Sequence, residues 1–175
     1  MKTIARNLCL ICLFIALNTV AASAQTVEDY LVLYGEALEY VGEYFAEPVD
    51  PEKRWISDDN FSGFGIKISP FTGTVRFSDN LPIACYVNTE VTSMTDGIIT
   101  GYDGFDIRIT FGDFEIEYRA IRIAPGLNPG GQVTKGQVIG HIRNGHNAVG
   151  GPGFRLAIRF KGVYLDPALF LVSLH

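Results

Sequence analysis

The chain of 175 residues contains little cysteine, little histidine and little charge. It has three cysteines and three histidines, and charged residues make up 19% of it. Hydrophobic residues reach 47%, which excludes the highly charged, core-poor composition of disordered proteins. The net charge of −5 argues against nucleic acid as the main partner. What is left is a globular chain of one-domain length.

The first 24 residues have the features of a secretory signal peptide. Lys2 and Arg6 precede an apolar run over residues 8–17, which is too short to span a bilayer comfortably. The small residues at 22–24 then match the usual cleavage pattern. We therefore expect residues 1–24 to be removed and the protein to be exported, either to the periplasm or out of the cell.

The three cysteines give no sign of a lipid anchor or a disulfide. Cys9 and Cys12 lie in the apolar run and lack the small preceding residue of a lipoprotein signal. No stable membrane anchor is therefore expected after cleavage. Cys85 is then the only cysteine, so it cannot form an internal disulfide. Its apolar neighbours, residues 81–87, predict a buried side chain rather than a nucleophile.

The segment after the signal peptide has helical periodicity. Between residues 26 and 45, apolar residues recur three and four positions apart, as on one face of an α-helix. Pro48 and Pro51 end this pattern. We expect residues 25–50 to form one helix and a linker. The helix packs on the domain that follows or, alternatively, docks onto a partner.

From residue 61 onward the apolar residues alternate with polar ones, which is typical of β-strands with one buried face. Gly112-Asp113 and Asp96-Gly97 each predict a tight hairpin turn. Residues 55–175 are therefore expected to form a mainly antiparallel β domain. The alternation is clearest in four segments: 63–68, 105–111, 114–119 and 154–160.

Residues 88–99, 131–140 and 151–167 follow one another in an order that resembles the motifs of one family, the M23 zinc metallopeptidases of the lysostaphin or LytM type. Residues 88–99 are similar to its strand-turn-strand motif, and residues 131–140 to its G-x-x-V-x-x-G-q-x-I-G motif. Residues 151–167 align without a gap on G-P-H-L-H-F-E-V-x-x-x-G-x-x-x-D-P. The resemblance covers roughly residues 60–171. It implies the family's antiparallel β-sandwich, the duplicated-hybrid-motif type, here with one N-terminal α-helix.

The same resemblance implies that the residues of the family's zinc chemistry are replaced. The zinc ligands of H-x-x-x-D and H-x-H fall on Ser78, Pro82 and Arg155, and the catalytic histidines fall on Ala120 and Gly153. A catalytic zinc needs three protein ligands and an open position for water. Proline has no donor atom, and a guanidinium repels the metal. We therefore expect no zinc, no other cofactor and no catalytic residue, which makes the chain a pseudoenzyme.

Four residues are candidates for binding in the former substrate groove. Alternation puts Arg155 and Arg159 on one strand face, where clustered arginines suit an anionic or carboxylate-bearing ligand. A simple solvated face is the other interpretation. Arg155 can also fill the place of the metal and pair with a carboxylate such as Asp79. The four candidates are Tyr118, Arg119, Arg155 and Arg159.

The sequence leaves three hypotheses on function. The first is an exported, inactive M23-like domain that binds or regulates in bacterial cell-envelope (peptidoglycan) metabolism. Its partner would be a cell-wall hydrolase, another envelope protein or peptidoglycan itself, with no role for nucleic acid. The second is an active zinc endopeptidase of peptidoglycan with relocated ligands, although His141 and His146 lack a usual chelating spacing. The third is a structural subunit that assembles through the N-terminal helix.

Overall fold

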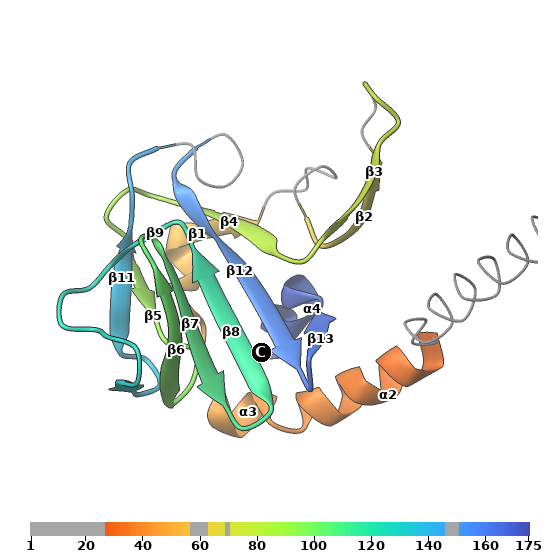
Figure 1. The fold of residues 1–175 in the computed structure, drawn as a ribbon, viewed down its shortest axis with the longest axis horizontal. Coiled ribbons are helices and arrows are strands. Elements are labelled where there is room, and N and C mark those ends of the chain that lie inside the picture. Colours follow the sequence, from red (N-terminus) through yellow and green to blue (C-terminus); the bar gives the residue numbers. More distant parts are fainter. Residues whose placement is uncertain (1–26, 57–62, 69–70, 146–150) are drawn as a thin grey trace, which may run out of the picture. The chain divides into compact units, whose positions relative to one another are not determined.

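The computed structural model describes residues 27–56, 63–68, 71–145 and 151–175 (Figure 1). The predicted signal peptide, residues 1–24, lies outside the described residues. The chain divides into two units between Glu36 and Ala37. Every buried hydrophobic residue in the described part belongs to the second unit, so residues 37–175 have their own core. No helix in the described ranges is long and apolar enough to cross a membrane.

One large antiparallel sheet dominates the second unit (Figure 1). Within the described ranges it has eight strands in the order β1-β4-β12-β8-β7-β6-β10, with β13 paired to β12. In chain order these strands are β1 (Arg54–Ile56), β4 (Leu81–Cys85), β6 (Gly97–Asp103), β7 (Asp106–Phe111), β8 (Phe114–Arg119), β10 (Gln132–Val133), β12 (Gly153–Phe160) and β13 (Val163–Leu165).

Two smaller antiparallel sheets and a few short helices complete the described part. Strands β5 (Glu90–Thr92), β11 (Val138–Ile142) and β9 (Ile121–Ile123) form a three-stranded sheet in that order. Strands β2 (Gly65–Ile68) and β3 (Val75–Ser78) pair only with each other. The helices are α2 (Val27–Leu38), α3 (Val41–Tyr44), the 3₁₀ helix η1 (Pro51–Lys53) and α4 (Pro167–Val172).

The large core side chains lie on one face of the large sheet, as the alternation in β8 shows, although β4 is buried on both faces. In β8 every second residue from Phe114 to Tyr118 is buried, and the residues between them are charged and partly exposed. Strand β12 pairs with β8 so that Ile158 lies opposite Ile116, and both side chains enter the core. The predicted mainly antiparallel β fold is confirmed. The charged face opposite the core is the one that holds the candidate site.

One of the two predicted hairpin turns is confirmed, and the other is wrong. Gly112 has a φ of 54° in the two-residue turn between Phe111 and Phe114, a conformation that glycine adopts without strain. Gly97, by contrast, begins β6 and pairs with Val133 of β10. Strand β5 pairs with β11 rather than β6, so Asp96-Gly97 joins two different sheets.

Gly97 is required for close packing rather than for a turn. A Cβ at this position would lie 2.5 Å from the carbonyl oxygen of Thr110 and 2.7 Å from Cγ2 of Ile109. Both atoms belong to β7, the neighbouring strand in the sheet. The glycine therefore lets β6 and β7 approach each other, which the sequence pattern alone does not distinguish from a turn.

Two helical features differ from the sequence prediction. The single helix expected over residues 26–45 is two helices, α2 and α3, separated at residues 39–40. The bend allows Tyr40 to contact Phe114, with ring centroids 5.6 Å apart, while Phe45 contacts the same ring at 4.8 Å. Helix α4 was not predicted. Its signal was present in Asp166, whose carboxylate accepts a hydrogen bond from the amide of Ala168 and caps the helix.

Replacing Gly97 with alanine should destabilise the fold. The new methyl group would overlap the backbone of β7, and relieving that overlap should lower the free energy of unfolding by roughly 1–3 kcal/mol. Gly42→Ala is the matched control, since nothing lies within 4 Å of its added Cβ. Urea unfolding of both variants measures the difference. Equal stability of Gly97→Ala and the unmodified protein would contradict the close approach.

Candidate functional site

Strand β12 brings together three of the predicted site residues. Arg155 lies directly opposite Pro82 of β4 on one side and opposite Arg119 of β8 on the other. Side chains of directly opposed residues in antiparallel strands project from the same face, with Cβ atoms about 5 Å apart. The face opposite the core therefore has Pro82, Arg155 and Arg119 in one row.

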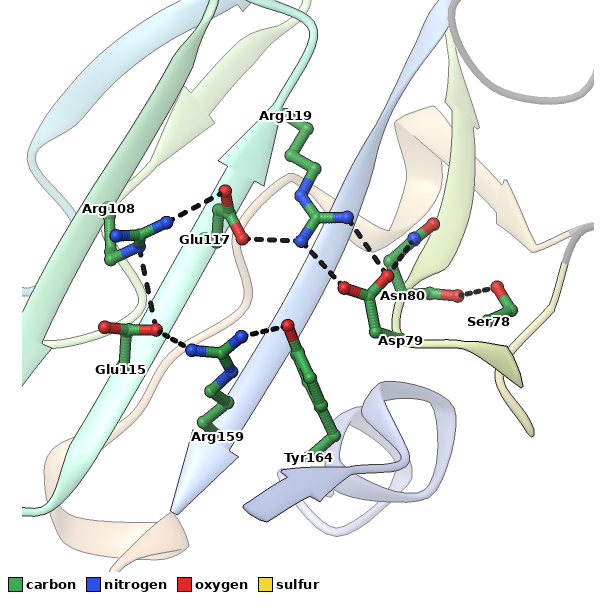
Figure 2. A network of polar contacts seen from close by, with 9 residues as sticks. All are labelled: Ser78, Asp79, Asn80, Arg108, Glu115, Glu117, Arg119, Arg159 and Tyr164. Atoms are coloured by element: carbon green, nitrogen blue, oxygen red, sulfur yellow. Dashed lines mark hydrogen bonds and ion pairs between the residues drawn. The ribbon is translucent and has the colours of Figure 1, made fainter. Parts of the chain in front are cut away.

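Arg119 is held by carboxylates on two sides (Figure 2). Its Nη1 and Nη2 donate to Oδ1 and Oδ2 of Asp79 at 3.0 and 2.9 Å, which is a bidentate pair. Nη2 also donates to Oε2 of Glu117 at 2.6 Å. The hydrogen bonds from Arg119 hold the pKa of Asp79 well below its usual range, and Asp79 in turn raises the pKa of Arg119.

Further ion pairs extend across β8 toward β7 and β13, and together with those of Arg119 they form one ion-pair network (Figure 2). Arg108 of β7 lies 3.5 Å from Glu117 and 3.6 Å from Glu115. Arg159 of β12 donates to Glu115 at 2.9 Å and also to the hydroxyl of Tyr164. The ion-pair network thus sets three arginines, at positions 108, 119 and 159, against three carboxylates, at 79, 115 and 117. Its charges are balanced internally.

Arg155 lies beside the ion-pair network without belonging to it. Arg155 is exposed, and its side chain makes no hydrogen bond or ion pair with the residues that the structure describes. The suggested pairing of Arg155 with Asp79 is wrong, because both carboxylate oxygens of Asp79 face Arg119. The positive charge of Arg155 is therefore directed to solvent, next to arginines that are already neutralised.

Tyr118 is wrongly placed among the groove residues. Its side chain is fully buried on the core face of β8, opposite to Arg119, and stacks with Phe154. Its hydroxyl accepts a hydrogen bond of 2.8 Å from the amide of Met94. Burial raises the pKa of this phenol above its usual value. Tyr118 thus connects β8 to the chain before β6, and strict alternation in residues 114–119 separates it from Arg119.

Ala120 and Gly153 stand where the resemblance puts the family's catalytic histidines, and both make their interactions through the backbone. Ala120 has a φ of 68°, and its amide donates to Oδ1 of Asp106 at 2.8 Å, which fixes this strained turn at the end of β8. Gly153 is the first residue of β12 and pairs with Ala84 of β4. Neither offers a side chain that can accept or donate a proton.

The residues that the resemblance puts at the ligand positions do not fit a zinc ion. Ser78 directs its hydroxyl to the carbonyl of Asn80 at 3.4 Å, Pro82 has no donor atom, and Arg155 carries a positive charge. No three His, Cys, Asp or Glu side chains gather into a possible metal site within the described ranges. His146, one of the two histidines considered for relocated ligands, lies outside the described residues.

Cys85 and a hollow on the surface of the described part lie apart from this site. Cys85 is buried and unpaired, and burial raises the pKa of its thiol to about 12, which is unsuitable for a nucleophile. The hollow has a volume of about 680 Å³, and none of the predicted site residues lines it. Its lining residues are Asp50, Lys53, Val87, Asn88, Thr89, Glu90 and Thr92.

Sequence reasoning missed most of the acidic half of the ion-pair network. Glu115 and Glu117 alternate with the core residues of β8, so their common face was predictable from spacing. Their pairing with Arg159 and Arg108 required the register between β12, β8 and β7. No local signal in the sequence indicates Tyr164 as a partner of Arg159.

Breaking the Asp79–Arg119 pair should destabilise the protein. A double-mutant cycle of Asp79→Asn and Arg119→Gln is expected to give a coupling energy of about 1–2 kcal/mol, since the pair is bidentate but partly solvated. Chemical unfolding of the four proteins measures it. A coupling energy of zero would mean that the pair contributes nothing to folding.

The contribution of Asp79 should depend on pH in a defined direction. Because the pKa of Asp79 is lowered in the folded state, its stabilising effect is complete above the unfolded pKa of about 4 and is lost as the pH falls toward the folded pKa. The stability difference between the unmodified protein and Asp79→Asn should therefore be constant above about pH 5 and shrink below about pH 4. A difference that grows on acidification would contradict this assignment.

Comparison with known proteins gives matches among solved structures alone. No protein-family profile and no curated protein matches the sequence. A zinc-containing peptidase from Vibrio cholerae is similar, with a TM-score of 0.60 and 19% identity. Csd3 from Helicobacter pylori has a TM-score of 0.56 and 22% identity. The SpoIIQ–SpoIIIAH pore-forming complex has a chain with a TM-score of 0.55 and 17% identity.

The extent of these matches differs between the three structures. They cover 77%, 73% and 74% of this chain, respectively. The match takes in 91% of the chain in the SpoIIQ–SpoIIIAH complex, but 40% of the Vibrio peptidase and 34% of Csd3. This chain thus matches only about a third of Csd3. At these identities the likeness shows the fold alone, and the chain has the M23 peptidase-type fold that its three sequence motifs predicted.

Proposed function

We propose that this protein is an exported, catalytically inactive domain of the M23 peptidase type that binds a partner in the cell envelope. The observation that carries the proposal is the row of Pro82, Arg155 and Arg119 on the face opposite the core. A metal site there would need donor atoms, and this row offers none. An ion-pair network lies beside it and leaves Arg155 directed to solvent.

The chemistry of the row favours a ligand that carries a carboxylate or another anion. A solvent-directed guanidinium presents several N–H donors in a fixed fork, which matches two carboxylate oxygens. Arg119 lies on the same face, but Asp79 and Glu117 already satisfy it. Arg155 is therefore the residue to which we assign the contact. Peptidoglycan peptides carry carboxylates, which makes peptidoglycan, or a hydrolase that acts on it, the partner we propose.

One structural neighbour is consistent with a binding role. The SpoIIQ–SpoIIIAH structure is a complex of two different proteins, and a chain of it shares this fold over nearly its whole length. The same fold also occurs in a zinc-containing peptidase, so fold alone does not decide between binding and hydrolysis. The side chains of Pro82 and Arg155, which offer no metal donor, favour binding over hydrolysis.

The protein should not retain zinc. Residues 25–175, exposed to zinc and then dialysed, are expected to contain less than ~0.1 equivalent by elemental mass spectrometry, because the aligned positions lack metal donors. The assay is paired with incubation on purified peptidoglycan, where no soluble fragments should appear. About one tight equivalent of zinc together with release of fragments would instead support the peptidase with relocated ligands.

Arg155→Ala should weaken binding without affecting the fold. We expect the variant to bind insoluble peptidoglycan at least about tenfold more weakly, because a charge-assisted hydrogen bond is lost. Its melting temperature should stay within about 2 °C of the unmodified protein, since Arg155 is exposed and makes no hydrogen bond or ion pair with the described residues. Lys135→Ala, in a different part of the chain, is the control for general loss of positive charge. Equal binding of Arg155→Ala and the unmodified protein would exclude Arg155 from the contact.

A further inference from the structure

The surface hollow beside β5 has a polar lining. One side of it comes from β5 and the turn before that strand, and the other from Asp50 and Lys53 at the two ends of η1. Apart from Val87, every residue that lines it is polar. Its volume of about 680 Å³ lies within the range of about 300–1,000 Å³ that small-molecule sites occupy. A hollow of this size and lining suits a polar ligand.

Thr89 brings a hydroxyl without a partner to this hollow. The residue is only 9% exposed, and its side chain makes no hydrogen bond with the residues that the structure describes. Its backbone is satisfied, since the amide donates to the carbonyl of Tyr86 at 3.2 Å and the carbonyl accepts from the amide of Ile142 at 2.9 Å. Burying a hydroxyl without a partner costs free energy. A ligand that hydrogen-bonds to Thr89 would recover that cost.

Asn88 is held so that its amide nitrogen is left over. It has a φ of 66°, a left-handed conformation that asparagine tolerates better than most residues. Its Oδ1 accepts a hydrogen bond of 3.1 Å from Nη2 of Arg122. Because a guanidinium can only donate, the oxygen must face Arg122. The two N–H donors of the Asn88 amide have no partner among the described residues.

Glu90 supplies an acceptor next to these donors. It is exposed, and its carboxylate makes no hydrogen bond or ion pair within the part of the chain that the structure describes. On the other side of the hollow, Lys53 and Asp50 pair with each other at 3.2 Å. Three consecutive residues, 88 to 90, therefore offer an amide donor, a hydroxyl and a carboxylate acceptor to one hollow.

We propose that this hollow binds a neutral saccharide. Each hydroxyl of a sugar ring donates one hydrogen bond and accepts others, so neighbouring hydroxyls can use the donors of Asn88, the hydroxyl of Thr89 and the acceptors of Glu90 together. Val87, 40% exposed, gives the C–H face of the ring an apolar contact. The inference does not rest on the proposed function, because no residue is shared with the row at Arg155.

The charges of the lining favour a neutral ligand over a charged one. An anion would be repelled by Glu90, since Lys53 is already paired with Asp50. A cation would gain little from one exposed carboxylate, whose attraction is weakened by water and salt. A simple cation would also leave the donors of Asn88 unused. A polyhydroxylated ligand satisfies all three residues without a net charge.

Titration calorimetry on residues 25–175, which contain the whole described part, tests the ligand class. The neutral probes are the β-1,4-linked tetramer of N-acetylglucosamine and maltotetraose. The charged probes are the glucosamine tetramer, a cation, and the galacturonate tetramer, an anion. We expect saturable binding of at least one neutral tetramer and binding at least about tenfold weaker for both charged ones. Absence of binding by both neutral tetramers, or tighter binding of a charged one, would overturn the proposal.

Two variants test the residues in the hollow. Thr89→Val keeps the shape of the side chain and should weaken saccharide binding about fivefold, while the melting temperature does not fall, because the hydroxyl makes no hydrogen bond with described residues. Glu90→Gln, at an exposed position, should weaken binding about tenfold, because a charged acceptor is replaced by a neutral one. Unchanged affinity in both variants would remove the ligand from this hollow.

Two control variants should bind the saccharide as the unmodified protein does. Glu39→Gln makes the same charge change at an exposed residue outside the hollow. Arg155→Ala removes the contact assigned under the proposed function, which a saccharide without a carboxylate does not need. Loss of saccharide binding in Arg155→Ala together with normal binding in Glu90→Gln would place the ligand at the row instead, and would contradict this inference without contradicting the proposed function.

Discussion

The backbone pairing of β12 between β4 and β8 is the constraint on which the site depends. This register sends Leu156 and Ile158 into the core and turns Arg155 toward the opposite face. A shift of one residue would exchange the two faces, and the buried side chains of β12 would be exposed to water. The core therefore fixes where Arg155 lies. The row of Pro82, Arg155 and Arg119 follows from packing on the other side of the sheet.

The ion-pair network gives the face opposite the core a structure that does not need a metal. Arg119 is enclosed by Asp79 and Glu117, and these partly buried charges are stabilised because each finds an opposite charge at hydrogen-bonding distance. Removing one partner would leave the other uncompensated. The network also explains how Arg155 can lie directly opposite another arginine: the charge of Arg119 is already neutralised. A fold shared with a zinc-containing peptidase thus presents an arginine to solvent on this face.

Much of the fold could be predicted from spacing, whereas the site could be predicted only in part. Alternation in residues 114–119 determines which side chains are buried and separates Tyr118 from Arg119, whereas the family motif alone does not separate them. The Asp96-Gly97 pair predicts a turn because a sequence pattern does not show which strand approaches Gly97. The pairing of Asp79 with Arg119 joins residues 40 positions apart and depends on tertiary register. The common strand face of Arg155 and Arg159 follows from local alternation alone.

The row of Pro82, Arg155 and Arg119 offers no donor atom to a metal ion, so it should hold none. Crystals of residues 25–175 grown with zinc, with diffraction measured on both sides of the zinc absorption edge, test this. We expect no anomalous peak beside this row and an intact Asp79–Arg119 pair in the same maps. A zinc peak within coordination distance of this row, with Asp79 turned toward the metal and away from Arg119, would contradict it.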